Sequence, residues 1–226
     1  MNVRIVALLA AVLPFAAVQL TYLVAAAHGL VDWCFPYIDS CTSISATGRE
    51  PPASYLFRAS MLPAAMLMMA YWWFNYSWLG HLHRQRGNSR QWRNRWMLGL
   101  GIAACIGLIL YVTVLGERGD AWRTQRRVGT IMFFSFTFLA QLLMLAQLGA
   151  LRVAGVRPGL LTAMRLVLLS LLLLGLLTVI LDAWNEQWYE TIEDAVEWVL
   201  SLLLQGNFLL GYFVWRQAGW RLEVKE

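Results

Sequence analysis

The sequence has few charged residues for its length. Charged residues make up 14% of its 226 residues, whereas hydrophobic residues make up 59%. A soluble domain of this size could not bury so much apolar surface, so the composition excludes that class and predicts an integral membrane protein. The net charge of +5 would suggest nucleic acid as a partner of a soluble protein. Here the arginines flank apolar stretches and are interpreted as topology signals, and we expect no nucleic-acid partner.

The sequence also lacks the common signatures of catalysis and metal binding. It contains no G-x-S-x-G and no H-E-x-x-H motif. His81 and His83 alternate in a short loop, but no acidic residue or cysteine lies near them, so we expect no metal and no cofactor. Paired broken helices, which are typical of transporters, are missing as well, apart from the isolated Pro14 and Pro63.

Long apolar stretches dominate what remains. A membrane-spanning helix needs roughly 20 mostly apolar residues. Six stretches meet this length approximately, and they predict one all-α domain, a bundle of six transmembrane helices over 5–27, 56–79, 96–115, 128–151, 166–181 and 195–215. The first stretch exceeds the roughly 7–15 apolar residues of a cleaved signal peptide, so we expect it to be a retained helix.

The distribution of charge predicts the orientation of this bundle. If both termini lie in the cytoplasm, twelve of the eighteen basic residues lie on that side, and eleven of the thirteen carboxylates lie on the other. The two sides then carry net charges of +10 and −5, as the positive-inside tendency requires. We therefore expect a multi-pass protein with cytoplasmic termini, most simply in a bacterial inner membrane.

The longest predicted loop, 28–55, contains two of the three cysteines. Cys34 and Cys41 lie on the side that is oxidising in a bacterial inner membrane or a secretory membrane, so a disulfide between them is plausible. Two free thiols are the alternative, because the geometry cannot be checked from sequence. Cys105 lies within the third span, where a cysteine acts as a small packing residue.

The same loop carries the pattern I-S-x-T-G-x-x-P-P-x-x-x-x-F, which runs from Ile44 to Phe57. This pattern resembles that of the Frag/DRAM/Sfk family, which comprises damage-regulated autophagy modulators and membrane proteins that remodel the lipid of GPI anchors. The resemblance implies about six transmembrane helices and a function linked to lipids. In a bacterial member the GPI anchor would be absent as a substrate.

Two further segments are similar to the family. They are 127–134, which begins R-V-G-T, and the pair Glu197-Trp198 near the start of the last helix. Relatives commonly have His-Asp before the first of these segments, whereas this sequence has Arg126-Arg127. A role that rests on that histidine cannot be transferred, which weakens an enzymatic interpretation.

The loop pattern itself has the composition of a defined turn. Gly48 permits a positive φ, and Pro51-Pro52 stiffens the approach to the next helix. Ser45 and Thr47 can cap backbone groups. A lid over the bundle and a direct contact with a ligand are both consistent with this pattern.

The last span carries a row of polar residues with helical spacing: Glu190, Asp194, Glu197, Ser201 and Gln205. Such a row is costly unless it faces the bundle interior or a watery cavity. We expect Arg58 to pair with Glu197 and the remaining interior partners to be Gln19, Tyr22, Thr137 and Gln141. Interhelical hydrogen bonds, each worth roughly 0.6 kcal/mol, are the alternative explanation of this row.

Three functions are compatible with these observations. The first is a non-catalytic protein that binds a phospholipid or glycolipid in an outward-facing polar cavity. Its partners are membrane lipids, and a homo-oligomer is compatible with the sequence. Its candidate ligand-binding residues are Gln19, Tyr22, Ser45, Arg58, Gln141, Asp194, Glu197 and Gln205. The second is a lipid-modifying acyl transferase or hydrolase, whose candidate acid–base groups are His28, Asp32, Glu193 and Glu197. The third is a small transporter or channel.

Overall fold

The computed structural model describes residues 3–87 and 91–220, and these residues contain helices and loops but no strand. The helices are α1 (Val3–Ala27), α2 (Pro36–Asp39), α3 (Ile44–Thr47), α4 (Ala53–Gln85), α5 (Gln91–Thr113), α6 (Asp120–Leu151), α7 (Pro158–Trp184), α8 (Glu186–Glu190) and α9 (Glu193–Gln217). Six of them, α1, α4, α5, α6, α7 and α9, are long and apolar enough to cross a membrane. The predicted all-α, multi-pass architecture is confirmed.

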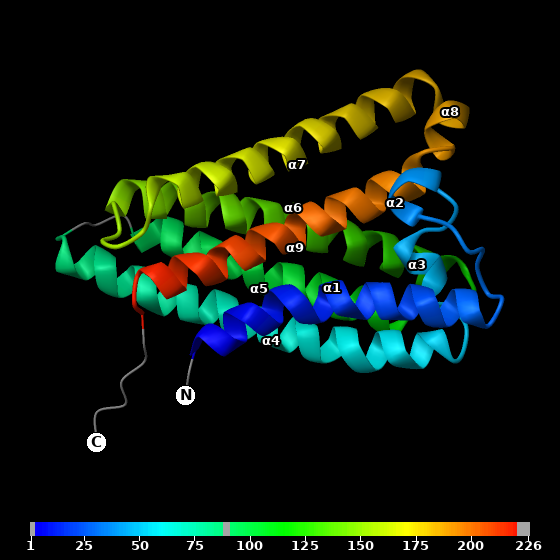
Figure 1. Cartoon of the computed structure of the whole chain (residues 1–226), viewed down its shortest axis with the longest axis horizontal. Coiled ribbons are helices and arrows are strands. Elements are labelled where there is room, and N and C mark those ends of the chain that lie inside the picture. Colours follow the sequence, from blue (N-terminus) through cyan, green and yellow to red (C-terminus); the bar gives the residue numbers. More distant parts are fainter. Residues whose placement is uncertain (1–2, 88–90, 221–226) are drawn as a thin grey trace.

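The six long helices run up and down along one axis, so that both ends of the described chain lie at the same end of the bundle (Figure 1). The opposite end carries α2, α3 and α8 (Figure 1). We call it the loop end.

All six long helices of the structure are longer than the spans predicted for them. At the loop end α6 begins at Asp120, eight residues before the apolar stretch that predicted it. An α-helix rises about 1.5 Å per residue, so its 32 residues cover about 48 Å, well beyond the roughly 30 Å of a hydrocarbon core. The two polar turns at its start lie outside the apolar stretch that a hydrocarbon core would cover. The third span ends earlier than predicted, at Thr113, where the chain turns toward Gly116 with its positive φ of 92°.

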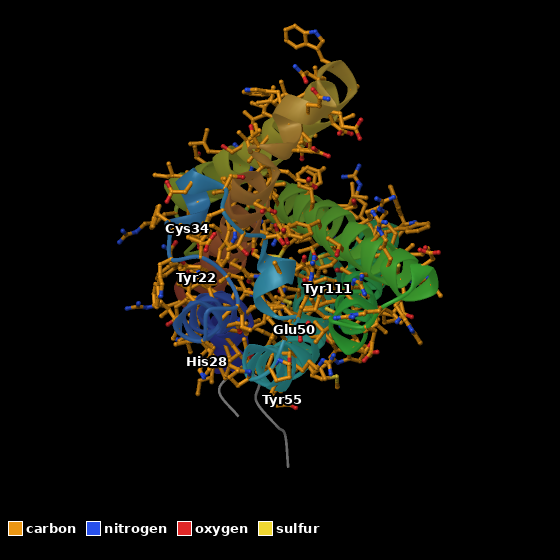
Figure 2. All side chains as sticks on the ribbon, turned by 90° about the vertical axis from the view of Figure 1, so that its right-hand side faces the viewer. Tyr22, His28, Cys34, Glu50, Tyr55 and Tyr111 are labelled. Atoms are coloured by element: carbon orange, nitrogen blue, oxygen red, sulfur yellow. A yellow bond between two sulfur atoms is a disulfide. The ribbon has the colours of Figure 1, made fainter. Side chains whose placement is uncertain are left out.

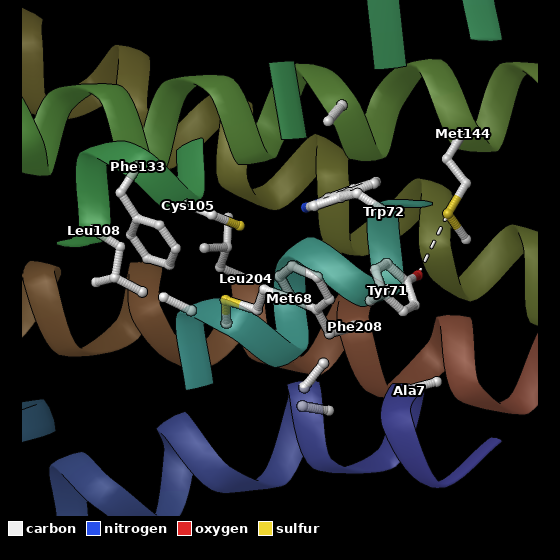
Figure 3. Close-up of a cluster of buried hydrophobic side chains, with 14 of the residues drawn as sticks. Ala7, Met68, Tyr71, Trp72, Cys105, Leu108, Phe133, Met144, Leu204 and Phe208 are labelled. Carbon is white, nitrogen blue, oxygen red and sulfur yellow. Dashed lines mark hydrogen bonds between the residues drawn. The ribbon is translucent and has the colours of Figure 1, made fainter. Parts of the chain in front are cut away.

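A cluster of large buried side chains fills the middle of the bundle (Figure 3). Tyr71 and Trp72 of α4 pack edge-to-face against each other and against Phe208 of α9. The Tyr71 hydroxyl donates to the sulfur of Met144 on α6 at 3.4 Å. Side chains of α4, α6 and α9 thereby form one core.

Among the described residues, α5 and α6 form the most extensive helix–helix contact. Gly107 and Gly129 face each other across it, and a Cβ added at Gly129 would lie 2.6 Å from the carbonyl oxygen of Gly107. The glycine of the R-V-G-T segment therefore permits backbone contact between two helices. In contrast, α7 packs mainly against α9 and leaves half of its leucines exposed. It diverges from α6 and α9 toward the loop end (Figure 1).

Candidate functional site

The loop between α1 and α4 folds back over the loop end and is fastened there. A disulfide joins Cys34 to Cys41, whose Cα atoms are 6.6 Å apart. The Tyr22 hydroxyl of α1 donates to the carbonyl of Cys34 at 2.7 Å and accepts its backbone N–H at 2.8 Å. Gln19 donates to the Tyr37 hydroxyl at 2.7 Å. Gln19 and Tyr22, two predicted ligand-binding residues, thus hold the loop in place.

Trp198 fastens the same loop from the side of α9. Its buried indole N–H donates to the carbonyl of Thr42 at 2.8 Å. Its ring packs edge-to-face against the rings of Tyr22 and Tyr37. The aromatic member of the Glu197-Trp198 pair is therefore an anchor for the loop.

The short helix α3 lies across the loop end, near Tyr111, as the end-on view shows (Figure 2). The Ser43 hydroxyl caps α3 by accepting the Ala46 N–H at 3.1 Å. Gly48 follows, and a Cβ there would lie 2.9 Å from side-chain atoms of both Phe57 and Leu115. The glycine and the last phenylalanine of the loop pattern thus meet in one packed contact, and we call this packed segment, 43–49, the lid.

Beside this lid lies a polar cavity of about 430 Å³. This volume falls within the range of ligand-binding pockets. Its walls come from α5 and α6, from α8 and α9, and from the lid, with side chains of Ser45, Arg49, Tyr111, Arg123, Arg126, Arg127, Thr130, Ile131, Phe134, Tyr189, Glu193, Val196, Glu197 and Leu200. We call it the loop-end cavity.

The α6 wall of the loop-end cavity is basic. Arg126 is held in place because its guanidinium donates to the carbonyl of Glu117 at 2.6 Å. Arg49, on the lid, donates to the Ser45 hydroxyl at 2.9 Å. The exposed guanidinium groups of Arg123 and Arg127 have no hydrogen-bond or ion-pair partner among residues 3–87 and 91–220. The charge of Arg127 acts on Glu193 of the opposite wall, but neither guanidinium is held by a direct contact, so both can bind an anion.

The opposite wall is acidic. Glu193 and Glu197 line it one turn apart on α9. Burial raises the pKa of Tyr189 on α8, and the neighbouring Glu193 carboxylate raises it further. Glu197 receives a hydrogen bond from the Ile44 backbone, and the positive charge of Arg49 acts on it.

The arginine whose charge acts on Glu197 is therefore Arg49, and not Arg58 as expected. Arg58 donates to the carbonyl of Leu115 and joins α4 to the turn after α5, and it lines neither this cavity nor the smaller one described next. The prediction that Arg58 pairs with Glu197 was wrong, because Arg58 lies within the first two turns of α4 and reaches the turn after α5, which the sequence could not place.

A smaller, mostly apolar cavity of about 40 Å³ continues from the loop-end cavity into the bundle. The two share Tyr111, Thr130, Phe134 and Glu197, and the inner one adds Ser201 and Gln205. Within the described chain the Tyr111 hydroxyl and the Gln205 carbonyl oxygen are buried without a hydrogen-bond partner. Both residues line the inner cavity, whose volume is sufficient for a water molecule. The polar row of α9 thus faces the interior at these positions.

Other predicted residues lie elsewhere. Gln141 donates to the carbonyl of Leu204 at 3.2 Å and joins α6 to α9. Asp194 lines neither cavity, although the charge of Arg49 acts on it. Glu190 belongs to α8, so the predicted continuous row was wrong at that position, because a turn at 191–192 separates the two helices.

Of the four candidate acid–base groups, two lie apart from the site. His28 and Asp32 are exposed on the loop after α1 and line neither cavity. Glu193 and Glu197 are the two that the fold brings together.

The sequence did not indicate Arg123, Arg126 and Arg127 as cavity residues. Their spacing of three and four residues, continued by Thr130, places them on one face of α6. That spacing could have identified them, had the helix been extended upstream of the apolar stretch.

The three segments that carried the family resemblance converge here. Ile44 and Phe57 line the inner cavity, 127–134 contributes part of the α6 wall, and Glu197 lines both cavities. A model of the Frag1/DRAM/Sfk1/Cwh43P N-terminal domain matches residues 2–215. Searches of curated proteins and of solved structures found no match. The chain is a multi-pass membrane protein that belongs to the Frag1/DRAM/Sfk1/Cwh43P family.

Proposed function

We propose that this protein binds a membrane lipid, a phospholipid or a glycolipid, with the polar headgroup in the loop-end cavity, and that it does so without catalysis. The observation that carries this proposal is the position of Glu197. A carboxylate near the hydrocarbon boundary is costly unless it faces a cavity or a partner. Here it faces a cavity of about 430 Å³ that also contains arginine, tyrosine and serine side chains.

The surroundings of the cavity support a lipid as the ligand. The cavity lies at the end of helices that are long and apolar enough to span a membrane. A lipid whose polar headgroup is bound there would have its acyl chains beside the bundle. We also propose that the loop end faces the periplasm of a bacterial inner membrane, with both termini in the cytoplasm. The charge distribution of the sequence supports this orientation.

Native mass spectrometry of the protein, purified in a mild detergent, tests the proposal. We expect one lipid to be retained per chain. Glu197→Gln should lower the retained fraction, because the amide keeps the shape of the side chain but removes its charge. Glu186→Gln is the matched control, since Glu186 is exposed on α8 and lines neither cavity.

Wild-type protein that retains no specific lipid would contradict the proposal, as would equal retention by the Glu197 variant. The same samples distinguish the enzymatic alternative. Acyl transfer or hydrolysis would convert the added lipid, and Glu197→Gln would abolish the conversion. Unaltered lipid after long incubation is the result that we expect.

A further inference from the structure

We propose that the ligand is a zwitterionic phospholipid with an amine headgroup, such as phosphatidylethanolamine, and that one of its acyl chains lies in a groove between α6, α7 and α9. This inference rests on the proposed function and specifies its ligand. The phosphate would bind the α6 wall, and the ammonium would bind the α9 wall.

The opposed charges of the two walls carry the first part of the proposal. Arg123 and Arg127 face the cavity from α6, and Glu193 and Glu197 face it from α9. In the described part of the chain no arginine of this cavity forms an ion pair with either carboxylate. The gap between the walls is therefore suited to a ligand that carries a negative and a positive group at its two ends.

Each wall has the chemistry that its group requires. Guanidinium groups bind phosphate oxygens in a bidentate manner. Arg123 and Arg127 form no hydrogen bond or ion pair within the described chain, although the charge of Arg127 acts on Glu193. An ammonium group is attracted by carboxylates and by the faces of aromatic rings, and Tyr111 and Tyr189 line the cavity together with Glu197. A purely anionic headgroup would meet two carboxylates, and an uncharged sugar would leave both walls unpaired.

The depth of the basic wall agrees with a lipid phosphate. Arg123 and Arg127 lie in the first two turns of α6, before the apolar stretch that starts at Val128. These turns extend into the headgroup region of the bilayer, where lipid phosphates lie. A phospholipid in the outer leaflet therefore has its phosphate at about the level of these side chains.

A second, apolar groove of about 220 Å³ lies directly below the loop-end cavity. It is lined by Phe134, Ser135, Phe138, Leu171, Leu172, Gly175, Leu176, Leu200 and Leu204. Phe134 and Leu200 line both spaces, so the groove continues from the polar cavity. Leu172 and Leu176 are 44% and 52% exposed, which opens the groove toward the surrounding lipid.

The divergence of α7 forms this opening. In both views α7 leans away from α6 and α9 as it approaches α8 (Figures 1 and 2). A polar cavity that continues into an apolar groove open to the side is complementary to a phospholipid. The headgroup would occupy the cavity and one acyl chain would occupy the groove. A water-soluble ligand would not need the groove, and a hydrocarbon would not need the charged walls.

A competition experiment tests the headgroup. The wild-type protein is equilibrated with equal amounts of phosphatidylethanolamine, phosphatidylglycerol and a diglycosyl diacylglycerol that have identical acyl chains, and the bound species are counted by native mass spectrometry. We expect phosphatidylethanolamine to be preferred over phosphatidylglycerol by about tenfold, the effect of one charge-assisted hydrogen bond.

The two walls are then removed separately. In the double variant Glu193→Gln and Glu197→Gln, the ratio of bound phosphatidylethanolamine to phosphatidylglycerol should fall to about one. In the double variant Arg123→Gln and Arg127→Gln, both phospholipids should be lost relative to the glycolipid. Arg118→Gln is the matched control, because Arg118 is exposed on the turn before α6 and does not line the cavity.

The groove has its own test. Gly175→Trp should fill it, since a Cβ at Gly175 has no neighbour within 4 Å, and should reduce phospholipid binding. Leu173→Trp is the control, because Leu173 is exposed on α7 outside the groove. Soluble phosphoethanolamine should not displace the bound lipid at equal concentration. If it does displace the lipid, the assignment of the groove to an acyl chain is overturned.

The outcomes separate the two proposals. Binding of the three lipids in equal amounts, or a preference for phosphatidylglycerol or for the glycolipid, overturns the zwitterionic assignment and leaves lipid binding intact. Binding of none of them overturns the proposed function itself. Monodisperse elution and an unchanged Tm of each variant show that a loss of binding does not reflect misfolding.

Discussion

The contact between Gly107 and Gly129 makes a quantitative prediction about the wall of the cavity. In Gly129→Ala, the new Cβ would lie 2.6 Å from the carbonyl oxygen of Gly107 and 2.9 Å from the backbone nitrogen of Tyr111. Both atoms belong to the backbone of α5 and cannot rotate away. The two helices must therefore separate, and Tyr111 and Thr130, which line the loop-end cavity, must move with them.

The size of the effect follows from two opposing terms. Overpacking a tightly packed contact costs about 1–3 kcal/mol, whereas replacing a helical glycine by alanine gains about 1 kcal/mol in helix propensity. Because the neighbours are backbone atoms, we expect the cost to lie near the upper end of its range. The net destabilisation is then about 1–2 kcal/mol, which lowers the Tm of a chain of this size by about 2–8 °C.

Thermal unfolding in detergent, followed by tryptophan fluorescence, measures this change. Gly206→Ala on α9 is the matched control, because a Cβ there has no neighbour within 4 Å and the Tm should not fall. A Tm for Gly129→Ala equal to that of the control would refute the argument that the glycine is required by close backbone contact.

Three further predictions concern the lid and the topology. Replacing Cys34 and Cys41 by serine should destabilise the protein by about 2.5 kcal/mol, which is the loop-closure contribution of a ring this short. A Tm equal to that of wild type under non-reducing conditions would argue against the bridge. Trp198→Phe removes the hydrogen bond to the carbonyl of Thr42 and should lower the stability by about 0.5–1.5 kcal/mol. The rate of backbone hydrogen exchange in residues 40–48 should rise, and an unchanged rate would contradict the role of Trp198 as an anchor. Reporter fusions after residues 187 and 226 should report opposite sides of the membrane, and the same side for both would contradict the six-span topology.

The number and order of the long helices could be predicted because hydropathy alone determines them. The third span was placed slightly too far along the chain, and α6 too late, because the polar turn of Arg123, Arg126 and Arg127 does not contribute to an apolar window. A helix continues past the hydrocarbon core as long as its backbone hydrogen bonds do. Because a hydropathy window ends where the apolar residues end, it also missed the arginines that form the basic wall of the cavity.

The candidate site could be predicted only in part, for a physical reason. The helical spacing of Glu197, Ser201 and Gln205 indicated one face, and these three residues line the inner cavity. Which residues oppose that face depends on how helices far apart in the sequence are rotated and packed. Arg58 was assigned to Glu197 by charge alone, whereas its position on α4 directs it to the carbonyl of Leu115.

The most direct test of lipid binding at the loop end is a structure of the protein in nanodiscs that contain phosphatidylethanolamine, determined by electron cryomicroscopy with a bound antibody fragment. We expect density for a headgroup between α6 and α9, with its phosphate at Arg123 and Arg127, its amine at Glu197 and an acyl chain continuing past Phe134 toward α7. A loop-end cavity that holds only water, or one closed by α7 packed against α6, would contradict the account.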